Sequence, residues 1–146
     1  PGGRRVTVSA SDWRENRAAT AAAHREALEQ RKAAESARAS AMIREFVAQA
    51  LQAGLQPEPL VARSYSGRTV YKTNLVGWYL RSNETVGVDT EGNFYLLSVE
   101  GSLKARFAGV SVEPSPPPLI LGYGARDGES MDLSQALALI LEKGHI

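Results

Sequence analysis

The residues best placed to do chemistry lie in a glycine-rich segment near the C-terminus. Gly122, Gly124 and Gly128 are spaced G-x-G-x-x-x-G between an apolar run and a helical pattern, which is where loops that bind phosphate occur. The segment lacks the Lys-Ser/Thr pair of a P-loop and ends several residues before the helix. A turn whose glycines allow positive φ is the simpler interpretation. We keep Gly122, Gly124 and Arg126 as candidate anion-binding residues.

Acidic side chains in and after the same segment raise the question of a divalent cation. Asp127, Glu129 and Asp132 are close in sequence, but they do not have the spacing of oxygen ligands in an EF-hand. Asp132 also stands where it would cap a helix. We therefore expect no metal site.

Catalytic groups are scarce in the rest of the chain. Cysteine is absent, which excludes thiol nucleophiles, disulfides and zinc ribbons. His24 lies within a helical pattern and His145 is the penultimate residue, so neither is near a plausible nucleophile. We expect no catalytic residue and no cofactor, and a protein that is not an enzyme. An enzyme or an anion-binding site near residues 122–132 is the third hypothesis.

A long helix is predicted before any of these residues. Asp12 and Glu15 form a capping-box pattern, so the helix is expected to begin at Trp13, and Gly54 is expected to end it after residue 53. Between residues 14 and 41 the one large aliphatic residue is Leu28, and most others are Ala, Arg or Glu. This composition predicts an arm over residues 1–41, which has little apolar surface to bury.

The end of the helix has a different pattern and opens the domain predicted for residues 42–146. Apolar residues there form a stripe along one face, which should cover a sheet: Met42, Ile43, Phe46, Val47, Ala50 and Leu51. Candidate contact residues for a partner are Trp13, Leu28, Met42 and Phe46.

The central part of the chain alternates between apolar and polar residues, as strands do. The predicted strands are Leu75–Arg81, Val86–Asp89, Phe94–Val99, Leu103–Phe107, Val110–Val112 and Leu119–Tyr123. Phe94–Val99 is apolar on both faces and is expected at the sheet centre, whereas Leu55–Leu60, with two prolines, is expected to be a linker. Asp89 to Gly92 should form a tight turn.

A last helix is expected to open at Asp132 and to end before Gly144, with a buried stripe of Leu133, Leu137, Ile140 and Leu141. The predicted class is α+β: an antiparallel meander of five or six strands, packed against this helix and preceded by the long one.

Charge and composition limit the possible partners. The net charge is +1, with nine Lys/Arg against six acids in residues 1–53. The first thirty residues contain no apolar run, and no stretch approaches the about 20 apolar residues that span a bilayer. We expect no membrane contact and a cytoplasmic location. The favoured function is protein interaction or self-association through the N-terminal helix. The alternative is nucleic-acid binding through the basic arm, an aromatic sheet face, or both.

Overall fold

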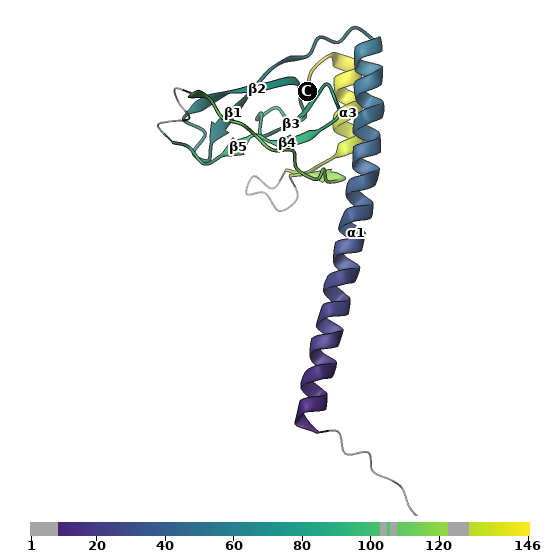
Figure 1. Ribbon diagram of the computed structural model, residues 1–146. Helices are drawn as coiled ribbons and strands as arrows, with labels where there is room; N and C mark the ends of the chain where they lie inside the picture. The colour runs from purple at the N-terminus through teal and green to yellow at the C-terminus, as the bar shows by residue number, and fades with distance from the viewer. Residues whose placement is uncertain (1–8, 103–104, 106–107, 123–128) are drawn as a thin grey trace, which may run out of the picture. The chain divides into compact units, whose positions relative to one another are not determined.

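The structure is a computed structural model that describes residues 9–102, 105, 108–122 and 129–146. Contacts divide the chain into two compact units, Pro1–Ala34 and Glu35–Ile146. The chain has a long N-terminal helix, a five-stranded, mostly antiparallel sheet and a C-terminal helix (Figure 1). The predicted α+β class is confirmed.

Helix α1 spans Ala10–Gln52 and begins three residues before the predicted start. The reason is its cap: the Ser9 hydroxyl donates to Asp12 Oδ2 at 2.8 Å, and the Asp12 N–H donates to Ser9 Oγ at 3.3 Å. The capping box therefore pairs Ser9 with Asp12 and not Asp12 with Glu15.

The C-terminal end of α1 is where the sequence predicts it. Gly54 has a φ of 78°. The Leu55 N–H donates to the Ala50 carbonyl at 2.9 Å and the Gly54 N–H to the Leu51 carbonyl at 3.1 Å. These two bonds define a Schellman motif, in which glycine adopts the left-handed conformation.

The two units use α1 differently. Every described residue from Ser9 to Ala34 is exposed. In the second unit the buried helix residues are Ala39, Ile43, Phe46, Val47 and Ala50. Most of the predicted apolar stripe is therefore confirmed. Leu51 is the exception, because its side chain is 50% exposed.

Five strands form the main sheet. They are β1 (Glu58–Ser64), β2 (Val70–Tyr79), β3 (Val86–Asp89), β4 (Phe94–Leu96) and β5 (Ser98–Val99), and their order is β4-β3-β2-β1-β5. Strands β1 to β4 pair antiparallel, but β5 pairs parallel with β1, so the sheet is mixed.

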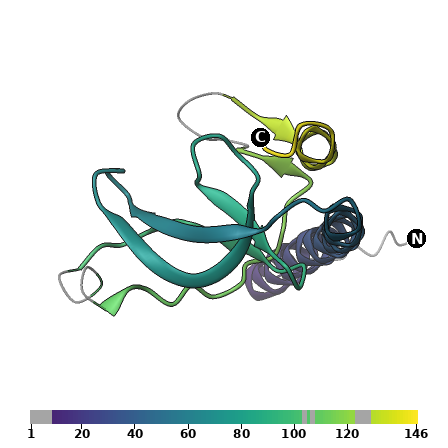
Figure 2. The same cartoon turned by 90° about the horizontal axis from the view of Figure 1, so that it is seen from above.

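The two outer strands, β4 and β5, follow each other directly in the sequence. Leu97 lies between them and makes a backbone hydrogen bond to each of their neighbouring segments. Its N–H donates to the Thr85 carbonyl and its carbonyl accepts the Arg63 N–H, both at 2.8 Å. The sheet thus curls into a small barrel (Figure 2). Phe94–Val99, predicted at the sheet centre, instead supplies both edges and closes the barrel.

Two sequence predictions in this region are wrong, and a third falls mostly on residues outside the described part of the chain. The segment predicted as a linker contains the start of β1. Proline has no N–H to donate, but Pro59 lies at the register shift between Pro59 and Val61, so it removes no hydrogen bond from a regular ladder. Of Leu103–Phe107 only Ala105 lies within the described residues. It is helical, with its carbonyl accepting the Gly109 N–H at 2.9 Å. Val110–Val112 forms no strand, although the Val110 N–H donates to the Lys72 carbonyl.

The last elements form a small hairpin and a helix. Strand β6 (Ile120–Leu121), shorter than predicted, pairs antiparallel with β7 (Met131–Asp132). Helix α3 spans Leu133–Lys143 and ends at Gly144, whose φ is 84°. Asp132 occupies the N-cap position, but its side chain makes no capping hydrogen bond.

The second unit has two apolar layers. The barrel interior contains Leu60, Tyr95 and Leu97. The outer layer packs the other face of the sheet, including Trp78 and Phe94, against α3 and the C-terminal end of α1, which lie along one side of the barrel (Figures 1 and 2). The rings of Phe46 and Trp78 meet edge to face, with centroids 5.5 Å apart.

Candidate functional site

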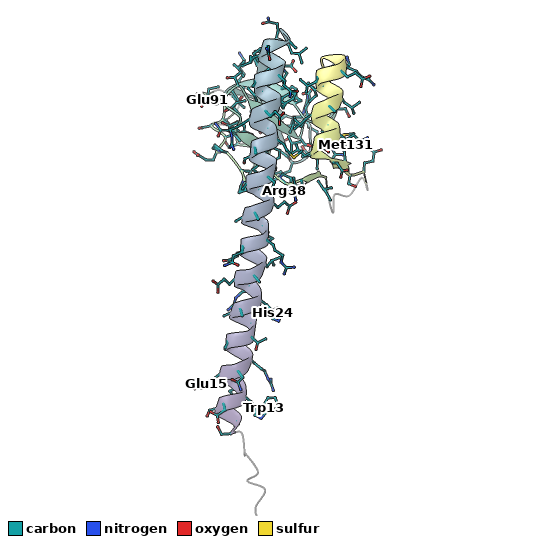
Figure 3. All side chains as sticks on the ribbon, turned by 90° about the vertical axis from the view of Figure 1, so that its right-hand side faces the viewer. Trp13, Glu15, His24, Arg38, Glu91 and Met131 are labelled. Atoms are coloured by element: carbon teal, nitrogen blue, oxygen red, sulfur yellow. The ribbon has the colours of Figure 1, made fainter. Side chains whose placement is uncertain are left out.

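The N-terminal half of α1 presents large apolar side chains to solvent. Trp13 is 56% exposed and Leu28 is 47% exposed. Because each helical residue turns about 100°, a spacing of fifteen residues puts these two within about 60° of each other around the axis. Trp13 and His24 also line one shallow hollow, and Figure 3 labels both side chains on the exposed part of α1. The helix therefore offers one face with two apolar anchors among basic and small residues.

The other two candidate contact residues lie in the second unit. Phe46 is buried against Trp78, and Met42 is half-buried and packs against the same core. Both side chains serve the core of the domain, which leaves Trp13 and Leu28 as the contact residues we retain.

Most of the described aromatic residues proposed for a stacking face are buried, and Phe107 lies outside the described residues. Tyr71, Trp78, Phe94 and Tyr95 are all buried. Among the described aromatic residues of the sheet region, Tyr65 stands out as exposed. Tyr95 lies in the barrel interior, and Trp78 and Phe94 lie in the layer that faces the helices, where a sheet covered on both faces needs large apolar side chains.

The candidate anion-binding loop is described only at its start. Gly122 has a φ of 75°, and a side chain there would clash with the Arg81 guanidinium and with the Glu129 carbonyl. Arg81 Nη2 donates to that carbonyl at 3.3 Å. Gly124, Arg126 and Asp127 lie outside the described residues, so the anion site stays a prediction.

A hollow that the sequence does not reveal lies within the second unit. It has a volume of about 350 Å³. Its wall is formed by the segment after α1, the end of β2, the β2–β3 turn and the end of α3. The lining residues include Glu58, Trp78, Tyr79, Arg81, Glu84 and Ile140. Clefts of this size, lined by apolar and a few polar groups, are typical of small-ligand sites.

The charges of two carboxylates act on the phenol of Tyr79 in this hollow. Burial raises the pKa of Tyr79, the hydrogen bond from the Val61 N–H lowers it, and the charges of Glu84 and Glu58 raise it further. The charge of Arg63 acts in the opposite direction, and the net result is a raised pKa. Arg63 and Glu84 form an ion pair at 3.1 Å in which each side chain is 36% exposed.

Two unusual features occur in the wall of the hollow. Glu84 has a φ of 60°, and no other non-glycine residue in the described part of the chain has a positive φ. Trp78 Nε1 is buried without a hydrogen-bond partner among the described residues. Backbone strain and unsatisfied buried donors are both uncommon, and both tend to occur at functional sites.

Comparison with protein-family models, curated proteins and solved structures finds no match for this chain. Within the described residues, no helix is long and apolar enough to cross a membrane. Any functional conclusion therefore depends on the chain's own geometry.

Proposed function

We propose that this protein is a non-enzymatic interaction module whose contact element is the exposed part of α1, residues 10–34. The observation that carries this proposal is the exposure of Trp13 and Leu28 on one helical face. Large apolar side chains placed on one face of a helix are the usual anchors when a helix binds in a groove or against another helix.

The energetics of the helix support the same proposal. Residues 10–34 are helical although all of them are exposed, and an isolated helix rich in Ala is only marginally stable in water. Binding a partner would bury Trp13 and Leu28 and stabilise this part of α1. A second copy of the chain is the first candidate, because it needs no component beyond the protein itself.

Nucleic-acid binding is the alternative. With most of the described sheet aromatics buried, it depends mainly on the basic arm, residues 1–41. The arm carries eight basic residues against five acids, an excess of three positive charges: Arg4, Arg5, Arg14, Arg17, Arg25, Arg31, Lys32 and Arg38, against Asp12, Glu15, Glu26, Glu29 and Glu35. Phosphate contacts made by these residues would weaken as the salt concentration rises. Binding to single-stranded DNA that weakens steeply with salt would favour this alternative.

The proposal is tested with a deletion and two matched substitutions. Removal of residues 1–34 should leave a folded domain, because Ala39 is the first buried residue of α1, and should lower the oligomeric state measured by light scattering. Leu28→Ala should weaken self-association, whereas Leu51→Ala should not, although the two side chains are almost equally exposed. Equal behaviour of the full chain, the deletion and both substitutions would exclude self-association through this helix.

A further inference from the structure

The charged residues in the exposed part of α1 are sorted by sign around the helix axis. Because successive residues turn by about 100°, all the Lys and Arg residues of 10–34 fall within an arc of about 120°. This basic arc also contains Trp13, His24 and Leu28, and its charged members are Arg14, Arg17, Arg25, Arg31 and Lys32. The acids of the same range fall within a separate arc of about 100°, the acidic arc: Asp12, Glu15, Glu26 and Glu29. Figure 3 shows Trp13 and His24 on one side of α1 and Glu15 on the other.

This separation of charge weakens the helix on its own. Residues three apart are neighbours on a helix surface, and within residues 10–34 three such pairs carry like charges: Asp12 with Glu15, Arg14 with Arg17, and Glu26 with Glu29. Opposite charges three or four residues apart occur twice, at Arg25 with Glu29 and at Glu29 with Lys32. A helix surrounded only by solvent would be more stable with alternating charges. The like-charge pairs are relieved when each arc faces charges of the opposite sign.

We propose that the basic arc binds the acidic arc of α1 in a second copy of the chain. This inference rests on the proposed self-association and names the two surfaces that meet. Charge selects this pairing, because five Lys/Arg would face four acids, whereas two basic arcs would repel each other. Size agrees with charge. The acidic arc also contains Ala19, Ala22 and Ala33, whose short side chains leave room for Trp13 and Leu28 of a basic arc to be buried.

The positions of the two arcs determine the type of assembly. Their centres lie about 150° apart around the helix axis, so one copy can use both arcs at the same time. Such an interface is heterologous: each contact joins two different surfaces, and the contact itself does not limit the number of copies. Wild-type protein should therefore form a series of assemblies that grows with protein concentration. Added salt should shorten the series, because it screens exposed charges.

Complementation between two variants tests the pairing. The first variant neutralises the basic arc with Arg14→Gln, Arg17→Gln and Arg31→Gln, and the second neutralises the acidic arc with Glu15→Gln, Glu26→Gln and Glu29→Gln. Because each variant retains one charged arc, each alone should self-associate about tenfold more weakly than wild type, or weaker still. An equimolar mixture should form a one-to-one complex, since the acidic arc of the first variant can bind the basic arc of the second. Light scattering measures the mass of each sample.

Controls separate the loss of an arc from the loss of the helix or of net charge. Glutamine is nearly as good a helix former as Arg or Glu, and circular dichroism checks the helical content of each variant. A control variant with Arg68→Gln, Lys72→Gln and Lys143→Gln removes three exposed positive charges from the second unit and should assemble as wild type does.

The outcomes distinguish this inference from the proposed function. If wild type self-associates and Leu28→Ala weakens it, but the two arc variants associate as wild type does or fail to complement each other, this inference alone is overturned. Wild-type protein that stays monomeric at every concentration would overturn the proposed self-association as well. A monomer that binds single-stranded DNA through the basic arc would assign that arc to phosphate instead.

Discussion

The hydroxyl of Tyr95 is the most informative group to remove from the barrel. Tyr95 is 5% exposed, and its O–H donates to Asp89 Oδ2 at 2.7 Å. Asp89 also accepts the Glu91 N–H at 3.0 Å, the Asn93 N–H at 2.8 Å and the Asn93 side-chain amide at 3.1 Å. The phenol thus joins the barrel interior to the turn between β3 and β4. Tyr95→Phe breaks this link while leaving the ring in place.

The size of the effect follows from the charge of the acceptor. A hydrogen bond to a charged group contributes about 1.5 to 3 kcal/mol, so Tyr95→Phe should lower the free energy of unfolding by about that amount at pH 7. The titration of the phenol gives the pH at which this effect disappears. Burial, followed by the hydrogen bond and the charge of Asp89, raises the pKa of Tyr95 from 10.0 to about 12. Because burial is the largest cause, the shift as a whole is not the energy of the hydrogen bond.

The sign of the pH dependence can be worked out from that shift. The pKa of Tyr95 is higher in the folded state, so the stabilisation is complete below about pH 10 and is lost as pH rises towards 12. Urea unfolding of the wild type and of Tyr95→Phe should therefore differ most near neutral pH and converge above pH 10. A difference below about 0.5 kcal/mol at pH 7, or one that is constant up to pH 12, would refute this account of the hydrogen bond.

Three further predictions concern stability. Burial raises the pKa of Asp89, but the hydrogen bonds that it accepts outweigh burial and leave that pKa lowered. The advantage of wild type over Asp89→Asn in urea unfolding should therefore be present above about pH 4 and shrink as pH falls below it. Gly77→Ala would place a Cβ against the Val88 carbonyl oxygen and should cost about 3 kcal/mol or more, whereas Gly67→Ala has open space and should cost about 1 kcal/mol for its positive φ. Thermal melts distinguish these two, and equal costs would contradict the predicted clash. Both Glu84→Gly and Glu84→Ala lose the ion pair, but glycine alone relieves the positive φ, so it should be the more stable by about 1 kcal/mol. Equal melting temperatures would show that Glu84 is unstrained.

Local patterns in the sequence predict the helices and several strands well. The bounds of β3 agree with the prediction, and Gly54 and Gly144 end their helices in the left-handed conformation. The errors arise where one pattern has two structural meanings. Prolines at 57 and 59 favour a linker, yet a bulge tolerates Pro59 within β1. Alternation over Leu103–Phe107 covers too few residues to exclude the helical turn found at Ala105.

The hollow could not be predicted because its wall is assembled from distant segments. Glu58 lies in β1, Glu84 in the turn between β2 and β3, and Ile140 in α3, and each has an ordinary explanation in its local sequence. The positive φ of Glu84 has no clear signal either, since Asn83 is the commoner residue type in that conformation. Only the fold brings the carboxylates, the phenol and the indole together.

Phe94–Val99 illustrates the same limit at the level of topology. Its apolar residues on both faces indicate that both faces are covered, which holds at Phe94, Tyr95 and Leu97 but not at Leu96, which is 51% exposed. A central strand is the usual way to cover both faces. The barrel achieves it differently: Phe94 faces the helices, whereas Tyr95 and Leu97 face the barrel interior. The Leu97 N–H donates a hydrogen bond to the Thr85 carbonyl, and the Leu97 carbonyl accepts one from the Arg63 N–H. Periodicity records how many faces of a strand are buried, but closure depends on which backbone groups meet, and that information is not local in the sequence.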